Sequence, residues 1–287
     1  MKRALVFGGS GQIGTALIAR LLAAGWEVHA VSRRPRTGLP RVQWVQGDFA
    51  SMPVLPRAID AIYSAGPLDL FSSWYPTAPM DCPQVVAFGS TSVLSKRAAT
   101  DPGERALAQR LFEAEAQLRE AAAAKGCAAT LLRPTLVYGL GRDRNLSSIA
   151  ALARRTGFFV LPAGATGLRQ PVHVEDLAQA ACAAAEGPAG MQRDYALPGG
   201  ETLPYREMVA RVLAALPSKP RLVELPSPLF RLLLAGARAG GVLRDLPGGA
   251  VARMREDLVF DDAPARRELA YAPRPFQPTA AMFEVSG

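Results

Sequence analysis

Short apolar runs alternate with stretches of helical periodicity over the first 139 residues. The runs expected to be strands are 3–7, 26–31, 41–46, 61–64, 85–88 and 129–132. Between them, stretches such as 12–24 and 102–125 repeat apolar positions at the helical period. Strands and helices in regular alternation are typical of a parallel sheet covered on both faces. The pattern therefore predicts an α/β protein with a Rossmann-type doubly wound parallel sheet and a small C-terminal α/β lobe.

The first predicted strand ends in a glycine-rich turn, Gly8-Gly9-Ser10-Gly11-Gln12-Ile13-Gly14, which leads into a helix. Such a turn brings bare backbone N–H groups and a helix N-terminus up to a diphosphate. Gly8 permits the tight turn, Gly11 the close approach of the pyrophosphate, and Gly14 the packing of helix on strand. The turn is a candidate dinucleotide-binding loop, although the motif alone leaves an ordinary glycine-rich turn open.

The second predicted strand ends in Ser32-Arg33-Arg34, where a dinucleotide fold meets the adenosine ribose. An acidic residue there accepts hydrogen bonds from the 2′-hydroxyl of NAD, whereas guanidinium groups suit a 2′-phosphate. The sequence therefore predicts NADP as the cofactor. The alternative is a solvated basic loop.

Charge and cysteine usage narrow the class of protein. The 287 residues include 33 Lys and Arg against 25 Asp and Glu, for a formal net charge of +8. The basic residues are scattered, without long runs or interleaved aromatics, so we expect no nucleic-acid partner. The cysteines Cys82, Cys127 and Cys182 lie far apart, which indicates reduced thiols and no metal site. Without a signal peptide or a long apolar stretch, we expect a cytoplasmic protein with no integral membrane contact.

The alternation loosens after residue 139, which indicates a second part of the chain. Helices are predicted at 145–155, 175–186 and 205–216, with a strand near 194–197 that rejoins the sheet. We expect residues 1–139 with about 170–198 to form the dinucleotide-binding Rossmann domain. Residues 140–169 with 199–287 then form the smaller substrate lobe. Within it, the basic and apolar stretch 228–243 is interpreted as a buried helix in preference to one that rests on a membrane surface.

Several further motifs follow the predicted strands in a fixed order. They are Gly47-Asp48, Ala65-Gly66, Gly89-Ser90-Thr91-Ser92, Arg133-Pro134-Thr135-Leu136-Val137-Tyr138-Gly139 and Pro171-Val172-His173-Val174-Glu175-Asp176-Leu177. With the glycine turn, this series resembles the extended short-chain dehydrogenase/reductase superfamily, whose members include the NAD-dependent epimerase/dehydratase-like proteins. The resemblance runs through nearly the whole chain.

The resemblance implies further contacts to the cofactor. Asp48 and Phe49 match positions that lie at the adenine in the family. Ser64, Ala65 and Gly66 match positions that line the path of the nicotinamide ribose.

For catalysis, the resemblance implies Ser90 as the family's Ser/Thr, with Thr91 as the fallback; the alternative is a hydroxyl that caps local backbone. The family also uses Tyr-x-x-x-Lys, in which lysine lowers the tyrosine pKa so that the phenol can pass a proton. No tyrosine of this chain has a lysine four residues on. If Glu115 matches the glutamate that follows the family's lysine, the two positions hold Leu107 and Leu111. The chain therefore resembles an atypical member that lacks the dyad.

Few other residues offer proton-transfer chemistry. Tyr138, expected at the end of the sixth strand, is the best remaining proton donor, although the family also keeps a tyrosine there for packing. Lys96 is a weaker candidate. His29 lies inside a predicted strand and His173 matches a structural position, so neither is favoured as a base.

Within residues 67–84, Pro76, Pro79 and Pro83 interrupt the segment, so a full crossover helix is not expected there. That helix normally helps to form the family's dimer interface, so the usual dimer is in doubt and a monomer or another interface is favoured. Phe71, Trp74 and Tyr75 in this segment either wall the substrate site or fill the gap left by the short helix.

Two functions remain open on the sequence. In one, the protein is an NADP-dependent oxidoreductase that acts on a small carbonyl, enone or quinone-type substrate without the usual dyad. In the other, it is a non-catalytic NADP-binding structural subunit or redox sensor. A nucleotide-sugar epimerase or dehydratase is less favoured, because epimerisation needs the phenol in both half-reactions.

Overall fold

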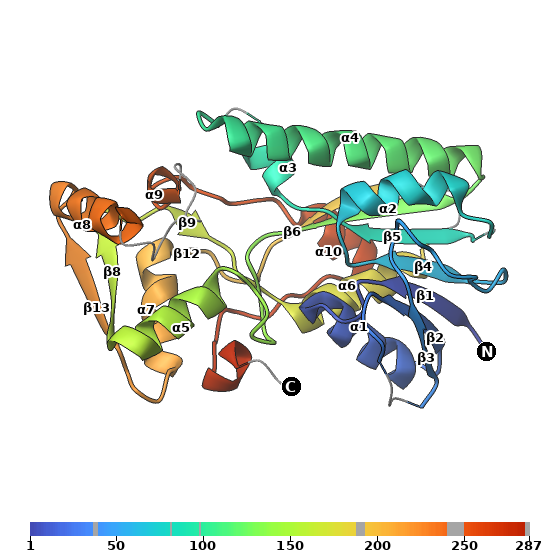
Figure 1. Cartoon of the computed structure of the whole chain (residues 1–287), viewed down its shortest axis with the longest axis horizontal. Helices are drawn as coiled ribbons and strands as arrows, with labels where there is room; N and C mark the ends of the chain where they lie inside the picture. The colour runs from blue at the N-terminus through green and yellow to red at the C-terminus, as the bar shows by residue number, and fades with distance from the viewer. Residues whose placement is uncertain (37–39, 81, 98, 188–192, 240–249, 285–287) are drawn as a thin grey trace. The chain divides into compact units, whose positions relative to one another are not determined.

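The computed structural model describes residues 1–36, 40–80, 82–97, 99–187, 193–239 and 250–284 (Figure 1). The chain divides into two compact units. The first unit consists of Met1–Thr135, Val172–Pro198 and Phe260–Pro273, and the second of Leu136–Pro171, Gly199–Val259 and Arg274–Gly287.

The first unit is built on a seven-stranded sheet in the order β11-β6-β5-β4-β1-β2-β3, with parallel neighbours (Figure 1). Its strands are β1 Arg3–Phe7, β2 Glu27–Ser32, β3 Val42–Gln46, β4 Ala61–Ser64, β5 Gln84–Phe88, β6 Ala128–Pro134 and β11 Arg193–Leu197. The order of the sheet reverses between β1 and β4, as in doubly wound folds. The predicted fold class is confirmed, and the segment near 194–197 joins the sheet beside β6.

Helices cover both faces of this sheet (Figure 1). They are α1 Gln12–Ala23, α2 Leu68–Trp74, α3 Ser92–Ser95, α4 Pro102–Ala124, α6 Val174–Ala185 and α10 Ala263–Leu269. On one face α1 packs against α6, and on the other α2 packs against α4. Local sequence sets the helix ends. Asp101 caps α4 by accepting the N–H of Glu104 at 3.0 Å, and Gly25 follows α1 with a left-handed φ of 83°.

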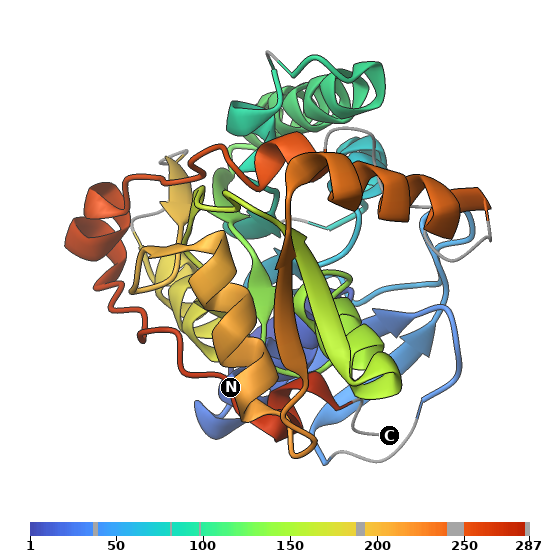
Figure 2. The same ribbon diagram turned by 90° about the vertical axis from the view of Figure 1, so that its left-hand side faces the viewer.

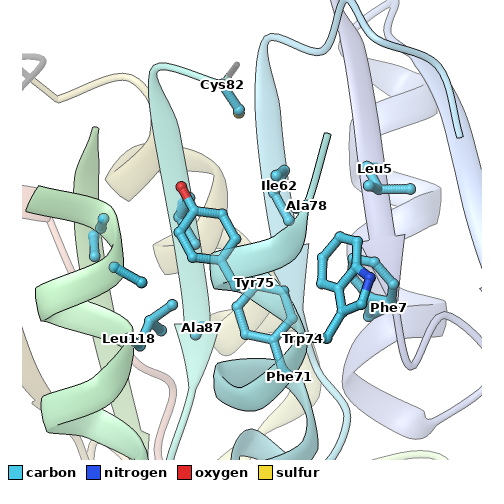
Figure 3. Packing of buried hydrophobic residues seen from close by; sticks show 14 of the residues in the cluster. Leu5, Phe7, Ile62, Phe71, Trp74, Tyr75, Ala78, Cys82, Ala87 and Leu118 are labelled. Atoms are coloured by element: carbon cyan, nitrogen blue, oxygen red, sulfur yellow. The ribbon is translucent and has the colours of Figure 1, made fainter. Parts of the chain in front are cut away.

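The crossover between β4 and β5 is short, as its prolines predict. Its described residues form the seven-residue α2 and the 3₁₀ turn η1 Tyr75–Thr77. Phe71, Trp74 and Tyr75 are 0%, 8% and 1% exposed, so they fill the core between α2 and the sheet (Figure 3). The ring of Phe7 lies 4.8 Å from Trp74 and 5.5 Å from Phe71. Of the two interpretations of these aromatic residues, the structure therefore supports packing.

One segment belongs to a different unit from the one that the sequence predicts. Phe260–Pro273, expected in the smaller lobe, belongs to the first unit, because α10 packs against α6 and β11. Glu268 Oε2 accepts hydrogen bonds from Tyr195 Oη and Arg193 Nη1 of β11, both at 2.7 Å. The segment thereby covers the outer edge strand of the sheet.

The second unit contains short strands and three longer helices. Its elements are β7 Val137–Tyr138, α5 Leu146–Thr156, β8 Phe158–Pro162, β9 Leu168–Arg169, β12 Leu203–Pro204, α7 Tyr205–Ala215, β13 Arg221–Leu225, α8 Ser227–Ala239, α9 Ala250–Arg253 and η2 Ala280–Phe283. The short strand β10, Val172–His173, lies in the first unit. Within the second unit β13 pairs with β8 in parallel, and β12 with β9 antiparallel.

Helix α8 corrects an expectation. The stretch from residue 228 was interpreted as a buried helix, but only one side of α8 is buried, where Phe230 and Leu234 are 7% and 8% exposed. Leu229, Leu232 and Leu233 face solvent, because the core of the second unit covers the helix from one side only. Residues 240–243 of the predicted stretch lie outside the described residues. None of the described helices combines the length and apolar composition needed to cross a bilayer.

A buried ion network ties three elements of the first unit together. The carboxylate of Glu115 in α4 is 1% exposed and accepts hydrogen bonds from Arg133 Nε at 2.8 Å and Arg133 Nη2 at 2.6 Å. Arg133 Nη2 also lies 2.7 Å from Asp194 Oδ2 of β11, and Arg119 binds both carboxylates. A bidentate pair of this kind stabilises only when its charges stay matched.

We expect Glu115→Ala to lower the free energy of unfolding by about 3–5 kcal/mol, because Arg133 would stay buried without its bidentate partner. Urea unfolding followed by circular dichroism measures the change. Glu113→Ala, on the exposed side of α4, is the matched control and should change stability by less than about 0.5 kcal/mol. Equal, small losses in both variants would contradict the interpretation.

Candidate functional site

The strand register brings the loops after β1, β4 and β5 to one edge of the sheet. Phe7 is the partner of Ser64, and Ser64 is the partner of Ala87. The N–H of Ala65 donates to the carbonyl of Phe7 at 2.9 Å, which continues the pairing past the strand ends. Because ligands of parallel sheets bind beyond the carboxyl ends of the strands, this edge is the candidate site.

Close backbone contacts surround Gly8, Gly11 and Gly14 of the predicted loop. Gly8 has a φ of 71°, and a Cβ on it would lie 2.6 Å from the backbone of Ala65 and Gly66. A Cβ on Gly14 would lie 2.2 Å from the Gly8 oxygen. The N–H of Gly11 donates to the same oxygen at 2.9 Å, and a Cβ on Gly11 would lie 3.2 Å from it. The loop therefore holds its tight shape only with glycine at positions 8 and 14, and position 11 leaves little room for a side chain.

The loop presents hydrogen-bonding groups that suit an anion. Helix α1 begins at Gln12, and no side chain caps its first N–H groups. Gln12 Oε1 and Ser64 Oγ are among the few buried polar side-chain atoms without a hydrogen-bond partner in the described part of the chain. A helix N-terminus with free N–H groups binds phosphate readily. The residues of this edge therefore fit a nicotinamide dinucleotide, with Gly9 buried and Ser10 and Ile13 half-buried in the loop.

The end of β2 is basic and open to solvent. Ser32 is buried and accepts the N–H of Arg34 at 3.3 Å, while the side chains of Arg33 and Arg34 are exposed. A third arginine, which the sequence motif missed, lies beside them. The guanidinium of Arg36 sits 5.6 Å above the ring of Trp44 on β3. The sequence could have indicated this contact, because an arginine follows β2 by a few residues and the neighbouring strand carries a tryptophan.

Asp48 and Phe49, predicted at the adenine, have structural contacts of their own. Asp48 Oδ1 accepts the N–H groups of Ala50 at 2.9 Å and Ser51 at 2.8 Å, so it shapes the turn after β3. The ring of Phe49 stacks on Phe7 with the centroids 5.2 Å apart. Their role at the adenine stays a prediction.

The structure separates the two candidate hydroxyls after β5. Thr91 is buried, and its hydroxyl donates to the carbonyl of Pro134 at 3.2 Å. Ser90 is half-buried, and its oxygen accepts the N–H of Ser92 at 3.1 Å. Among the described residues the Ser90 proton has no acceptor. Ser90 therefore caps local backbone and still has a proton to donate, whereas the Thr91 proton is engaged.

Helix α4 offers little proton chemistry near these hydroxyls. Leu107 and Leu111 are half-buried, and α4, all of which is described, contains neither tyrosine nor lysine. Lys96 Nζ lies 3.9 Å from Glu104 Oε1, so this weaker candidate is engaged in an ion pair.

Tyr138 belongs to the second unit and is 1% exposed. Its ring meets that of Phe276 edge-on, 5.0 Å between centroids, inside the core of that unit. Its role as a proton donor stays a prediction.

Neither histidine has the surroundings of a catalytic base. His29 is 6% exposed within β2, and burial lowers the pKa of its imidazole below the ordinary value. His173 Nδ1 accepts the N–H of Glu175 at 3.2 Å and so caps α6. No cluster of side chains suited to a metal ion occurs in the residues that the structure describes.

We expect Gly14→Ala to weaken dinucleotide binding by at least about tenfold, because its Cβ would displace the Gly8 carbonyl and open the loop. Isothermal titration calorimetry with NADPH measures the affinity. Gly236→Ala, in α8 with no atom within 4 Å of the added Cβ, is the control and should bind as the wild type does. Unchanged affinity in Gly14→Ala would exclude this loop from the cofactor site.

Two curated proteins resemble the chain in sequence. Over 127 residues, 44% of this chain, it is 31% identical to NADH dehydrogenase (ubiquinone) 1 alpha subcomplex subunit 9, mitochondrial, from Arabidopsis thaliana, and the match spans 31% of that protein. Over 94% of both chains it is 27% identical to 2-alkyl-3-oxoalkanoate reductase from Stenotrophomonas maltophilia.

Solved structures share the fold. The UDP-glucose 4-epimerase from Bifidobacterium longum, in complex with NAD+ and UDP, superimposes with a TM-score of 0.69 over 98% of this chain and 97% of its own, at 17% identity. The sequence profile of the NAD dependent epimerase/dehydratase family matches residues 4–66 and 66–197, well over half of the chain. The protein is therefore a member of the NAD dependent epimerase/dehydratase family.

Proposed function

We propose that this protein is an NADP(H)-dependent oxidoreductase that acts on a small carbonyl, enone or quinone-type substrate without a Tyr/Lys dyad. The observation that carries the proposal is the Ser90 hydroxyl. It follows β5 at the same edge of the sheet as the glycine loop, and its proton has no acceptor among the described residues. The 27% identity to a protein named 2-alkyl-3-oxoalkanoate reductase, over 94% of both chains, supports ketone reduction.

The choice of NADP rests on charge at the end of β2. Arg33 and Arg34 are exposed where the adenosine ribose is expected, and Arg36 lies close by against Trp44. No acidic residue follows β2 before residue 48. Guanidinium groups bind a 2′-phosphate with charge-assisted hydrogen bonds, so NADPH gains over NADH at this point.

The chemistry divides between cofactor and chain. When bound, the nicotinamide supplies or accepts a hydride. The glycine loop would hold the cofactor in position for hydride transfer. Ser90 Oγ would donate a hydrogen bond that polarises the substrate carbonyl. Leu107 and Leu111 provide apolar surface and no proton. The proton that completes reduction then comes from the Ser90 hydroxyl, from water or from Tyr138.

A second function is favoured by the same two leucines. A chain that binds NADP without a proton donor on α4 suits a structural subunit or a sensor of the NADPH/NADP ratio. The 31% identity to a protein named as a subunit of NADH dehydrogenase points the same way. A nucleotide-sugar epimerase is less favoured because its two half-reactions need the phenol.

We expect the wild type to bind NADPH at least about tenfold more tightly than NADH, through charge-assisted bonds to the 2′-phosphate. Arg33→Ala should remove this preference, and Arg57→Ala, an exposed arginine elsewhere in the first unit, should retain it. Fluorescence titrations with both cofactors test the three proteins. Equal affinities of the wild type for NADPH and NADH would contradict the assignment.

Oxidation of NADPH, followed by its absorbance against a panel of ketones, aldehydes, enones and quinones, tests the activity. With a substrate in hand, Ser90→Ala should lower kcat by about 10²-fold, the usual effect of removing one such donor. Tyr138→Phe tests the second donor, and a rate equal to the wild type would exclude it. Tight NADPH binding without turnover of any substrate would favour the structural or sensor function.

A further inference from the structure

Helix α8 carries a row of exposed leucines that the dinucleotide site does not explain. Leu229, Leu232 and Leu233 are 54%, 72% and 49% exposed. Their spacing of three and four residues places them on one face of the helix. Phe230 and Leu234 are buried on the opposite side and anchor the helix to the second unit.

The helix is held in place at its start. Arg255 Nη2 donates to Ser227 Oγ at 2.6 Å and to the carbonyl of Ala163 at 3.1 Å. α8 begins two residues after β13 ends, and it packs against β8 of the same unit (Figure 2). The leucines are therefore presented by an anchored helix, which gives the exposed row a fixed shape.

The charged residues of α8 itself are all basic. α8 contains Arg231 and Arg238 and no acidic residue, and the Arg231 side chain is exposed. Helices that lie in a membrane interface combine an apolar face with basic residues, and anionic headgroups attract such basic segments.

A protein partner fits the row less well. Standard protein interfaces bury about 800 Å² on each side and depend on Trp, Tyr and Arg anchors. Three leucine side chains expose far less area, and no aromatic side chain of α8 is exposed, because Phe230 is buried. A row of leucines on a helix that carries arginine on its other face matches acyl chains and phosphate headgroups better.

We propose that α8 docks peripherally on a membrane surface rich in anionic phospholipid. Leu229, Leu232 and Leu233 enter the boundary between headgroups and acyl chains, and Arg231 lies at the phosphates. A single short apolar face gives reversible binding that weakens with salt, because part of the attraction is electrostatic. The docking is independent of the oxidoreductase proposal, since α8 contributes no residue to the glycine loop or to Ser90.

Co-sedimentation of the full chain with vesicles tests the proposal. We expect binding to phosphatidylcholine vesicles that contain phosphatidylglycerol, weaker binding to phosphatidylcholine alone, and a loss of binding at high salt. Leu232→Asp should weaken binding by roughly tenfold, since it replaces a leucine that would be buried in lipid by a charge. Arg231→Gln should reduce only the component that depends on phosphatidylglycerol.

The matched control is Leu70→Asp, which changes a leucine that is 50% exposed on α2 of the first unit. It should bind vesicles as the wild type does. Circular dichroism and NADPH affinity, measured on each variant, show that the fold and the cofactor site are intact. Absence of wild-type binding to either vesicle, or equal binding by Leu232→Asp, would overturn the proposal. So would a wild-type dimer that Leu232→Asp converts to a monomer, because the row would then be a protein interface.

Discussion

The first unit depends on the close approach of three backbone segments around Gly8. Its oxygen accepts the N–H of Gly11 and lies 2.2 Å from where a Cβ on Gly14 would be. A Cβ on Gly8 itself would lie 2.6 Å from the backbone at Ala65. Strand β1, the start of α1 and the end of β4 can therefore meet only with hydrogen as the side chain at these points. That meeting leaves the N-terminus of α1 open to an anion, which is the physical basis of the proposed cofactor site.

The strand end that carries Ser90 is held by a buried ion pair. Glu115 and Arg133 link α4 to β6, and Asp194 extends the network to β11. A Cβ added to Gly89 would lie 3.1 Å from Glu115 Oε1, so this carboxylate packs directly against the strand end that carries Ser90. Burying Glu115 and Arg133 costs free energy unless both stay paired, and the pair fixes the position of that strand end as a result.

The features that support cofactor binding in this protein are clearer than those that support a catalytic step. The glycine loop, the arginines after β2 and the family membership support a dinucleotide, whereas α4 contains neither tyrosine nor lysine. Hydride transfer needs mainly position, so a hydroxyl with a free proton is sufficient for the proposed reduction. In the second unit, α8 exposes a row of leucines that takes part in neither cofactor binding nor the proposed reduction.

The sequence by itself determined the features that depend on neighbouring residues: the strands and helices of the sheet, the glycine turn, the basic end of β2 and the short crossover broken by prolines. Only the tertiary structure decided the features that depend on distant partners. The Thr91 hydroxyl donates its hydrogen bond to the carbonyl of Pro134, 43 positions away, whereas the Ser90 hydroxyl only accepts one, from Ser92. The burial of Trp74, the contact of Arg36 with Trp44 and the place of Phe260–Pro273 were decided in the same way. The physical reason is that local sterics and periodicity act within a few residues, whereas hydrogen-bond acceptors and buried surface are supplied by the packing of the whole unit.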